Sequence, residues 1–102
     1  MVKREKRTTN RSNYEVQVTI EVNNQNFVGK SKDISAGGMF IICDEYPGIG
    51  EKAMITFDLP SIPKTNMGAF IRWYNKLGFG VQFAPIGARQ THEINRICSK
   101  RT

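Results

Sequence analysis

Short stretches of this chain alternate between apolar and polar residues, and this period of two constrains the fold more than any other feature. In residues 14–22 every second side chain from Val16 to Val22 is apolar, and residues 53–59 and 79–83 repeat the pattern. Side chains two apart lie on the same face of a β-strand, whereas a helix would place them on different sides. The alternation therefore predicts strands that bury one face and expose the other.

Six strands are predicted altogether, separated by residues that form turns. They are expected at 14–22, 27–33, 39–43, 53–59, 67–74 and 79–83. Asparagines in 23–26, Gly37 and Gly38, and two prolines in 60–66 lie between them, and the prolines predict a break in the sheet. Strands this short favour a small antiparallel barrel, because closure hides the edges of the sheet.

Residues 88–100 suit a helix instead. Ile94, Ile97 and Cys98 are spaced three and four residues apart, so on a helix they form one narrow apolar stripe. We expect this C-terminal helix to pack on the barrel. A chain of 102 residues has room for one domain of this kind.

The positive charge of the chain is concentrated before the first predicted strand. The formal net charge is +6, and residues 1–12 supply +4 of it through five basic residues and one acidic residue. We expect residues 1–12 to form a flexible basic arm and residues 13–102 to form the folded domain. Such an arm suits an anionic partner, such as a phosphorylated small molecule, a nucleic acid or an acidic membrane.

The composition argues against an enzyme, a metal site and a membrane span. His92 is the only histidine, and neither Cys43 nor Cys98 belongs to a CxxC pair, whereas a structural zinc site needs about four ligands. No apolar run approaches the roughly 20 residues of a transmembrane helix, and the N-terminus lacks the apolar segment of a secretory signal. The sequence therefore predicts a cytoplasmic binding protein without a cofactor.

Two short motifs carry the chemistry. Arg7 and Arg11 form an RxxxR pattern just before the first strand, and residues 33–38 form a DxSxxG pattern between the second and third strands. Each motif is weak alone. An RxxxR arises by chance in a basic segment, and Asp33 and Ser35 suit an ordinary turn in which they bind nearby backbone.

In this order, the two motifs resemble those of the PilZ domain family. The Leu59-Pro60 pair after the fourth strand, the closing strand Gly80-Val81-Gln82-Phe83 and the C-terminal helix also agree, so the resemblance covers about residues 6–100. It implies a mainly β fold, a six-stranded split barrel with a C-terminal α-helix. It also implies that the chain binds cyclic di-GMP, a bacterial second messenger, and is not an enzyme.

The side chains of both motifs suit this ligand. An arginine can bind the guanine edge, stack on the base and pair with phosphate, so Arg7 and Arg11 can reach two sides of one ligand. Asp33 can accept hydrogen bonds from the N1 and N2 donors of guanine, and Ser35 can donate to a ligand oxygen. Gly38 takes the last position of the motif by resemblance. Additional candidate contacts are Lys6, Gly37 and Trp73.

The predicted function is that of a receptor or adaptor. Ligand binding would order the arm and change a surface that a protein partner of unknown identity reads. An exposed apolar patch near Met39, Tyr46, Ile49 or Ile62 would favour this role. Two alternatives stay open: a PilZ-like interaction module that binds no ligand, and a small nucleic-acid-binding barrel, although the predicted exposed faces lack the run of aromatic residues typical of the latter.

Overall fold

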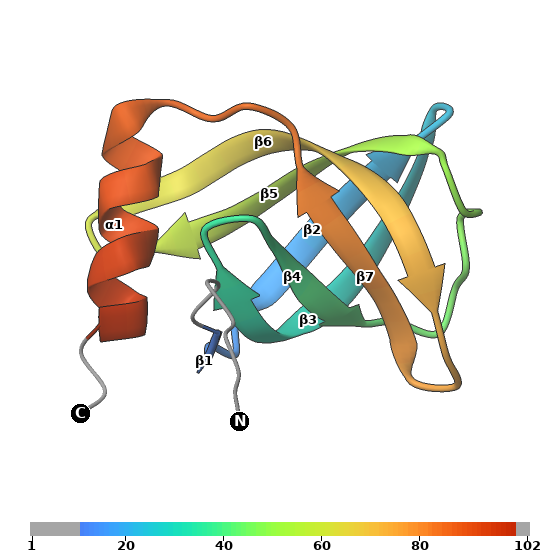
Figure 1. Ribbon diagram of the computed structural model, residues 1–102. Helices are drawn as coiled ribbons and strands as arrows, with labels where there is room; N and C mark the ends of the chain where they lie inside the picture. The colour runs from blue at the N-terminus through green and yellow to red at the C-terminus, as the bar shows by residue number, and fades with distance from the viewer. Residues whose placement is uncertain (1–10, 100–102) are drawn as a thin grey trace, which may run out of the picture.

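The structure is a computed structural model, and it describes residues 11–99. Seven strands precede a single helix (Figure 1). The elements are β1 Ser12–Asn13, β2 Gln17–Val22, β3 Gln25–Ser35, β4 Gly38–Ile42, β5 Lys52–Leu59, β6 Ile62–Tyr74, β7 Gly78–Phe83 and α1 Ala88–Ser99. The sheet thus begins at Ser12, the last residue of the predicted arm.

Strands β2 to β7 close into a barrel. β3 pairs with β2 along one edge and with β4 along the other, and β5, β6 and β7 lie between them in the order β2, β5, β6, β7, β4. All of these pairings are antiparallel. The six-stranded antiparallel barrel is therefore confirmed, and β1 is an additional short strand that pairs with β3.

The prediction of one continuous strand at 14–22 is wrong at its start, because β2 begins only at Gln17 and a separate short strand, β1, ends at Asn13. β1 and β2 both pair with β3, but their registers differ by one residue. The fully buried Ser31 hydroxyl fills the gap, accepting a hydrogen bond from Val16 N at 3.0 Å and donating one to the Tyr14 carbonyl. Such a register change bends the strand, and beyond it the chain lies alongside β3 as far back as Arg11.

The predicted break at residues 60–66 is present but shorter, since only Pro60 and Ser61 separate β5 from β6, which already begins at Ile62. The pairing of β5 with β6 is irregular near the turn, and Lys64 there has a φ of 54°. Asp58 Oδ1 accepts a hydrogen bond from Lys64 N at 2.7 Å and holds this irregularity in place. The irregular pairing accommodates Pro63, whose nitrogen cannot donate to a regular ladder.

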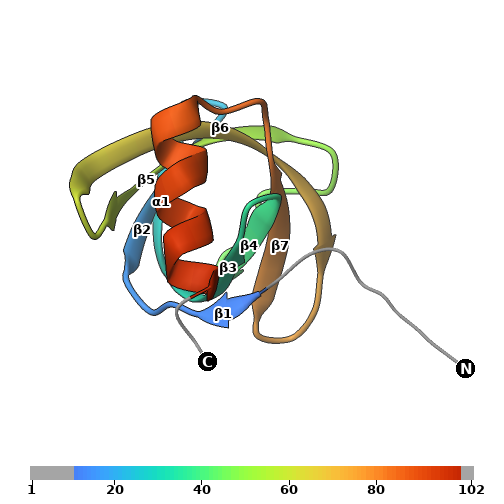
Figure 2. The ribbon, with the colours of Figure 1, turned by 60° about the vertical axis from the view of Figure 1, so that its left-hand side comes forward.

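Helix α1 lies across one end of the barrel (Figure 2). Ile94 and Cys98 from its predicted apolar stripe are buried against the core, and Ile97 is half-buried. The opposite end carries the hairpin between β6 and β7 and the long loop between β4 and β5 (Figure 1). Within residues 11–99, no helix is both long and apolar enough to span a membrane.

Candidate functional site

A row of paired residues crosses the outer face of the barrel from β3 to β6. Asp33 on β3 pairs with Phe40 on β4, and Phe40 pairs with Gly80 on β7. Gly80 in turn pairs with Trp73 on β6. Paired residues on neighbouring strands lie side by side. The acidic residue of the second motif and the only tryptophan of the chain therefore belong to one surface.

Both outer strands of this surface carry a β-bulge at the row. The register of β3 shifts between Ser31 and Asp33, and that of β6 shifts between Ile71 and Trp73. The extra residue on β3 places both Lys32 and Asp33 on the outer face, between inward-facing neighbours. Bulges commonly redirect side chains beside binding sites, and here one lies on each side of the surface.

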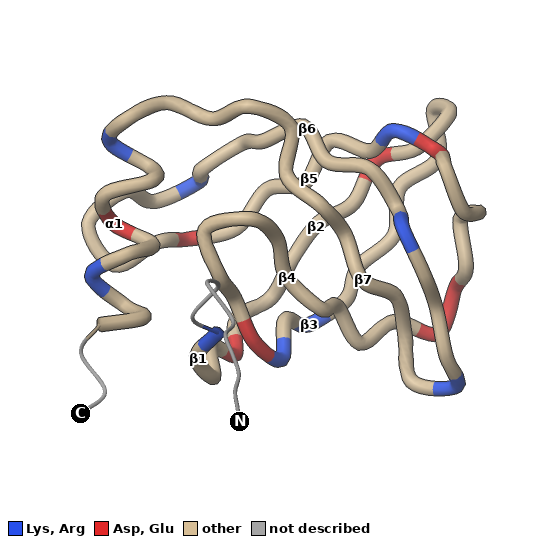
Figure 3. The backbone as a smooth tube through the Cα atoms, viewed as in Figure 1, with Lys and Arg blue, Asp and Glu red and all other residues tan. Residues whose placement is uncertain are grey.

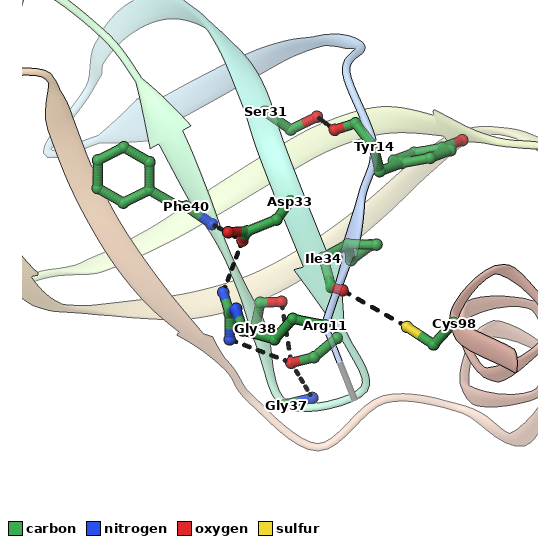
Figure 4. Close-up of polar contacts among 10 residues, drawn as sticks. Arg11, Tyr14, Ser31, Asp33, Ile34, Gly37, Gly38, Phe40 and Cys98 are labelled. Carbon is green, nitrogen blue, oxygen red and sulfur yellow. Dashed lines mark hydrogen bonds and ion pairs between the residues drawn. The ribbon is translucent and has the colours of Figure 1, made fainter. Parts of the chain in front are cut away.

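The two sequence motifs meet at Asp33 (Figure 4). One guanidinium nitrogen of Arg11 lies 2.8 Å from Asp33 Oδ1, and the other donates to Ser35 Oγ at 3.4 Å. Phe40 N also donates to Asp33 Oδ1, at 3.3 Å. All of the hydrogen bonds that Asp33 accepts within residues 11–99 go to Oδ1. Its second oxygen, Oδ2, accepts no hydrogen bond from this part of the chain.

Ser35 and the two glycines shape the turn between β3 and β4. Ser35 is 1% exposed, and its hydroxyl accepts from Gly37 N at 3.3 Å and lies 3.4 Å from the Gly38 carbonyl. A Cβ on Gly38 would lie 2.0 Å from the Val81 carbonyl oxygen, whereas one on Gly37 would meet nothing within 4 Å. Gly38 therefore allows β4 and β7 to approach closely, a requirement that does not depend on any ligand.

The opposite side of the surface is aromatic. Trp73 stacks on Phe40 with ring centroids 5.1 Å apart, and its indole lies over Gly80, where a Cβ would come within 2.5 Å of the ring. The tryptophan is nonetheless 49% exposed. It therefore presents an indole face to solvent on the same surface as Asp33.

A depression of about 230 Å³ lies between the two sides. Arg11, Lys32 and Asp33 form its polar wall, Trp73 stands on the opposite wall, and Leu77 lines it at the hairpin end. Pockets that enclose a whole drug-sized ligand measure about 300–1,000 Å³. This depression is therefore suited to part of a ligand, such as one base, with the remainder outside it.

The structure brings most of the predicted site residues together. The β3–β4 hairpin carries Asp33, Ser35, Gly37 and Gly38, and Arg11 lies beside it. Trp73 lies across the depression from them, as the additional contact predicted for it requires. Arg7 and Lys6 lie outside the described residues. The ligand contacts themselves stay predictions.

Sequence reasoning missed Lys32, Leu77 and Gly80 as parts of this site. Lys32 reaches the depression only because of the bulge in β3, and no pattern in the sequence indicates that bulge. Leu77 belongs to the hairpin loop, where a single apolar residue carries little information. Gly80 did carry a signal, because a glycine inside an alternating strand often marks the close approach of another group. Here that group is the indole ring.

An apolar surface lies at the end of the barrel opposite α1. Tyr46 from the loop after β4 stacks on Tyr74 of β6 at 4.1 Å, and its hydroxyl accepts a hydrogen bond from Ile49 N. All three side chains are about half exposed. Tyr46 and Ile49 therefore fit the predicted apolar patch, but Met39 is fully buried and Ile62 is half-buried.

Helix α1 is attached to the strand that carries the second motif. Cys98 Sγ lies 3.4 Å from the carbonyl of Ile34, the residue between Asp33 and Ser35 (Figure 4). The buried Glu93 carboxylate accepts hydrogen bonds from Ser61 N at 3.1 Å and Arg96 at 3.0 Å. The hydrogen bond from Ser61, followed by the attraction of Arg96, lowers the pKa of Glu93 below its usual value.

Neither cysteine takes part in a disulfide. Cys98 is buried, Cys43 is half-buried, and burial raises the pKa of the Cys43 thiol. Within residues 11–99, no three side chains of the metal-binding types gather into a group that could hold an ion.

The fold and the meeting of the two motifs define a class of protein, a small closed barrel with a depression on its outer face beside the motifs. A PilZ domain model matches residues 5–100, and the chain belongs to the PilZ domain family. Proteins of this family are binding and adaptor modules. Their barrel and C-terminal helix correspond to the elements described above.

Solved structures confirm the fold. The inhibitor of motility of Bacillus subtilis, MotI/DgrA, is similar with a TM-score of 0.76 and 19% sequence identity. The similarity covers 95% of this chain and 51% of the Bacillus chain, so the present chain spans about half the length of that protein. At this identity the likeness concerns the fold alone. Among curated proteins, none matches the sequence significantly.

Proposed function

We propose that this chain is a cyclic di-GMP receptor that acts as an adaptor for a protein partner. The observation that carries the proposal is the contact of Arg11 with Asp33 and Ser35 at the edge of a depression that Trp73 borders. It joins a residue of each motif across 22 positions of sequence. The site thereby combines a cation, a carboxylate acceptor and an aromatic face, which are the groups that a guanine nucleotide requires.

One guanine of the ligand would enter the depression. Oδ2 of Asp33 would accept from the N1 and N2 donors of the base, because a carboxylate oxygen has lone pairs for more than one donor. The Trp73 indole would contact the base face, since stacking needs a flat surface and no particular hydrogen-bond pattern. The polar wall would then select guanine, and the aromatic wall would add affinity.

The arginines would bind the charged part of the ligand. The Arg11 side chain is 45% exposed and has donors left beside the two that Asp33 and Ser35 accept. Arg7 and Lys6 would contact the guanine and phosphates that the depression leaves uncovered. Closing residues 1–10 over the ligand would change the surface beside it, and this is the step that would relay the signal.

An adaptor also needs a surface for its partner. Tyr74, which stacks on Tyr46, follows Trp73 on β6, and the exposed Leu77 lines the depression itself. Exposed aromatic residues of this kind are enriched in protein interfaces. The name of the Bacillus protein, an inhibitor of motility, supports a regulatory role for this fold. The proposed partner is a protein whose identity is open.

Calorimetric titration of cyclic di-GMP tests the receptor function. The wild-type chain should bind, and Arg11→Ala should weaken binding by about 100-fold, because a charge-assisted contact is lost. Arg89→Ala is the matched control, since Arg89 is an exposed arginine on α1 that does not line this depression. GTP should bind poorly to all three. Absence of wild-type binding at micromolar protein would reject the proposal and leave the interaction module without a ligand.

The nucleic-acid-binding barrel is the less supported alternative. Among the residues that the structure describes, lysines and arginines are scattered over the helix, the strands and the hairpin, interspersed with acidic residues, rather than gathered in one stripe (Figure 3). A barrel that binds single strands usually has a continuous basic groove with several stacking aromatics. Titration with a short oligonucleotide at two salt concentrations separates the two functions, because binding to many phosphates weakens steeply with salt.

A further inference from the structure

We propose that Lys32 is a further ligand-binding residue, and that it contacts a phosphodiester on the side of the bound guanosine opposite Arg11. This inference rests on the proposed binding of cyclic di-GMP and adds to it a residue outside both sequence motifs. It follows from the bulge in β3, from the position of Arg11 and from the chemistry of a cyclic dinucleotide.

The bulge places Lys32 in the site. In a regular strand, the residue next to Asp33 would point to the opposite face of the sheet. The register of β3 against β4 shifts between Ser31 and Asp33, so Lys32 is the inserted residue. Ser31 is fully buried, whereas Lys32 is exposed and lines the same depression as Asp33. Two neighbouring side chains, one basic and one acidic, therefore share one wall.

Arg11 and Lys32 lie on different sides of Asp33. The Arg11 guanidinium contacts both Asp33 and Ser35, so it lies toward the end of β3 that carries the motif turn. Lys32 precedes Asp33 and lies toward the other end, where Leu77 of the hairpin completes the depression. The acceptor for a guanine edge is thus flanked by two cations.

The ligand has anions in a matching arrangement. Each guanosine of a cyclic dinucleotide is linked to phosphodiesters through both its 3′ and its 5′ oxygen. A guanosine whose base is bound at Asp33 therefore has a negative charge on either side of its ribose. Arg11 can reach only one of them, and an ammonium group suits the other because a phosphate accepts a point charge without a fixed orientation.

Titration of cyclic di-GMP into single variants tests this role. Lys32→Ala should weaken binding about tenfold, as expected for loss of one charge-assisted contact to an exposed phosphate. Lys32→Arg should retain most of the affinity. Lys30→Ala is the matched control, because Lys30 is an exposed lysine on the same strand that lies outside the depression and is 3.8 Å from Glu15. Thermal unfolding should be the same for all four proteins.

Ionic strength provides a second measurement. The ratio of wild-type to Lys32→Ala affinity should shrink between about 0.05 and 0.5 M salt, because screening weakens the exposed ion pair. If the wild type binds and Arg11→Ala does not, but Lys32→Ala binds as the wild type does, the inference about Lys32 is overturned and the proposed function stands. If the wild type itself fails to bind, both proposals fail together.

Discussion

The two walls of the depression are held in place by different forces. On the polar wall, Asp33 is fixed by an ion pair with Arg11 and a hydrogen bond from Phe40 N. On the aromatic wall, Trp73 lies over Gly80 and against the Phe40 ring, and no hydrogen bond within residues 11–99 holds its indole. A hydrogen bond requires a particular donor and acceptor, whereas every base has a flat face that can stack. The polar wall can therefore recognise one base edge, whereas the aromatic wall can accept any base.

This difference also explains why the polar wall carries a sequence motif and the aromatic wall does not. Directional contacts need particular residue types at a fixed spacing, and such a spacing is visible as a motif. A stacking surface needs only a flat ring with space beside it, and that space depends on which strands lie next to each other. Each wall can be tested by removing the interactions that define it.

The largest effect is expected for the glycine that joins the polar wall to β7. Gly38→Ala would place a methyl group 2.0 Å from the Val81 carbonyl oxygen, so β4 and β7 would have to separate. We expect the free energy of unfolding to fall by about 3 kcal/mol or more, as measured by urea denaturation.

Gly37→Ala is the control for this variant, because a Cβ at that position meets nothing within 4 Å. Its stability should stay within about 0.5 kcal/mol of the wild type. Equal stability of the two variants would show that Gly38 has no structural requirement and would leave ligand contact as the reason for a glycine there.

The second prediction compares how much ligand affinity is lost when a side chain is removed from each wall. Asp33→Ala should weaken cyclic di-GMP binding by about 100-fold, since a charged acceptor for the base and the anchor of Arg11 are both lost. Asp33→Asn should lose less, because one acceptor oxygen remains. Trp73→Ala should cost about tenfold, the lower end of what stacking on one base contributes.

Selectivity should separate the walls more clearly than affinity does. The ratio of affinities for the guanine and the adenine cyclic dinucleotide should fall in Asp33→Ala but stay unchanged in Trp73→Ala. If the tryptophan variant loses selectivity instead, the assignment of base recognition to the polar wall is wrong. Calorimetry with both ligands on the wild type, Asp33→Ala and Trp73→Ala measures the comparison.

A smaller effect is expected when Trp73 is moved rather than removed. Gly80→Ala would bring a methyl group within 2.5 Å of the indole, which can tilt away from β7 at little cost because it is half exposed. We expect about a fivefold loss of ligand affinity with a stability change below about 1 kcal/mol. Trp73 is the only tryptophan, so its fluorescence reports both the displaced ring and the bound ligand.

The strands were largely predictable because alternation is a local property. Val18, Ile20 and Val22 are buried as the period of two requires. Local patterns do not show register, however. The register change at Ser31 delays the start of the first predicted strand to Gln17, and the bulge at Lys32 adds a cation to the site. Both depend on how β3 pairs with its neighbours. The site was predicted where a motif encodes it and missed where only pairing creates it.

The smallest effect concerns the helix behind the polar wall. Glu93 anchors α1 to the turn before β6, and hydrogen bonds from Ser61 and then Arg96 lower the pKa of its carboxyl group. A carboxyl group with a lower pKa in the folded state stabilises the fold above its unfolded pKa, and this contribution is lost as pH falls through the folded pKa. The stability difference between the wild type and Glu93→Gln should therefore be largest near neutral pH and shrink below about pH 4.

Urea denaturation of both proteins from pH 7 to pH 3 measures this difference. Ligand binding at pH 7 should change little in Glu93→Gln, because the carboxylate lies on the helix and not in the depression. A large loss of affinity would instead show that α1 supports the polar wall through the contact between Cys98 and Ile34. The polar wall would then depend on the helix as well as on the sheet, while the aromatic wall, whose Trp73 and Gly80 lie on β6 and β7, would keep its affinity for the base.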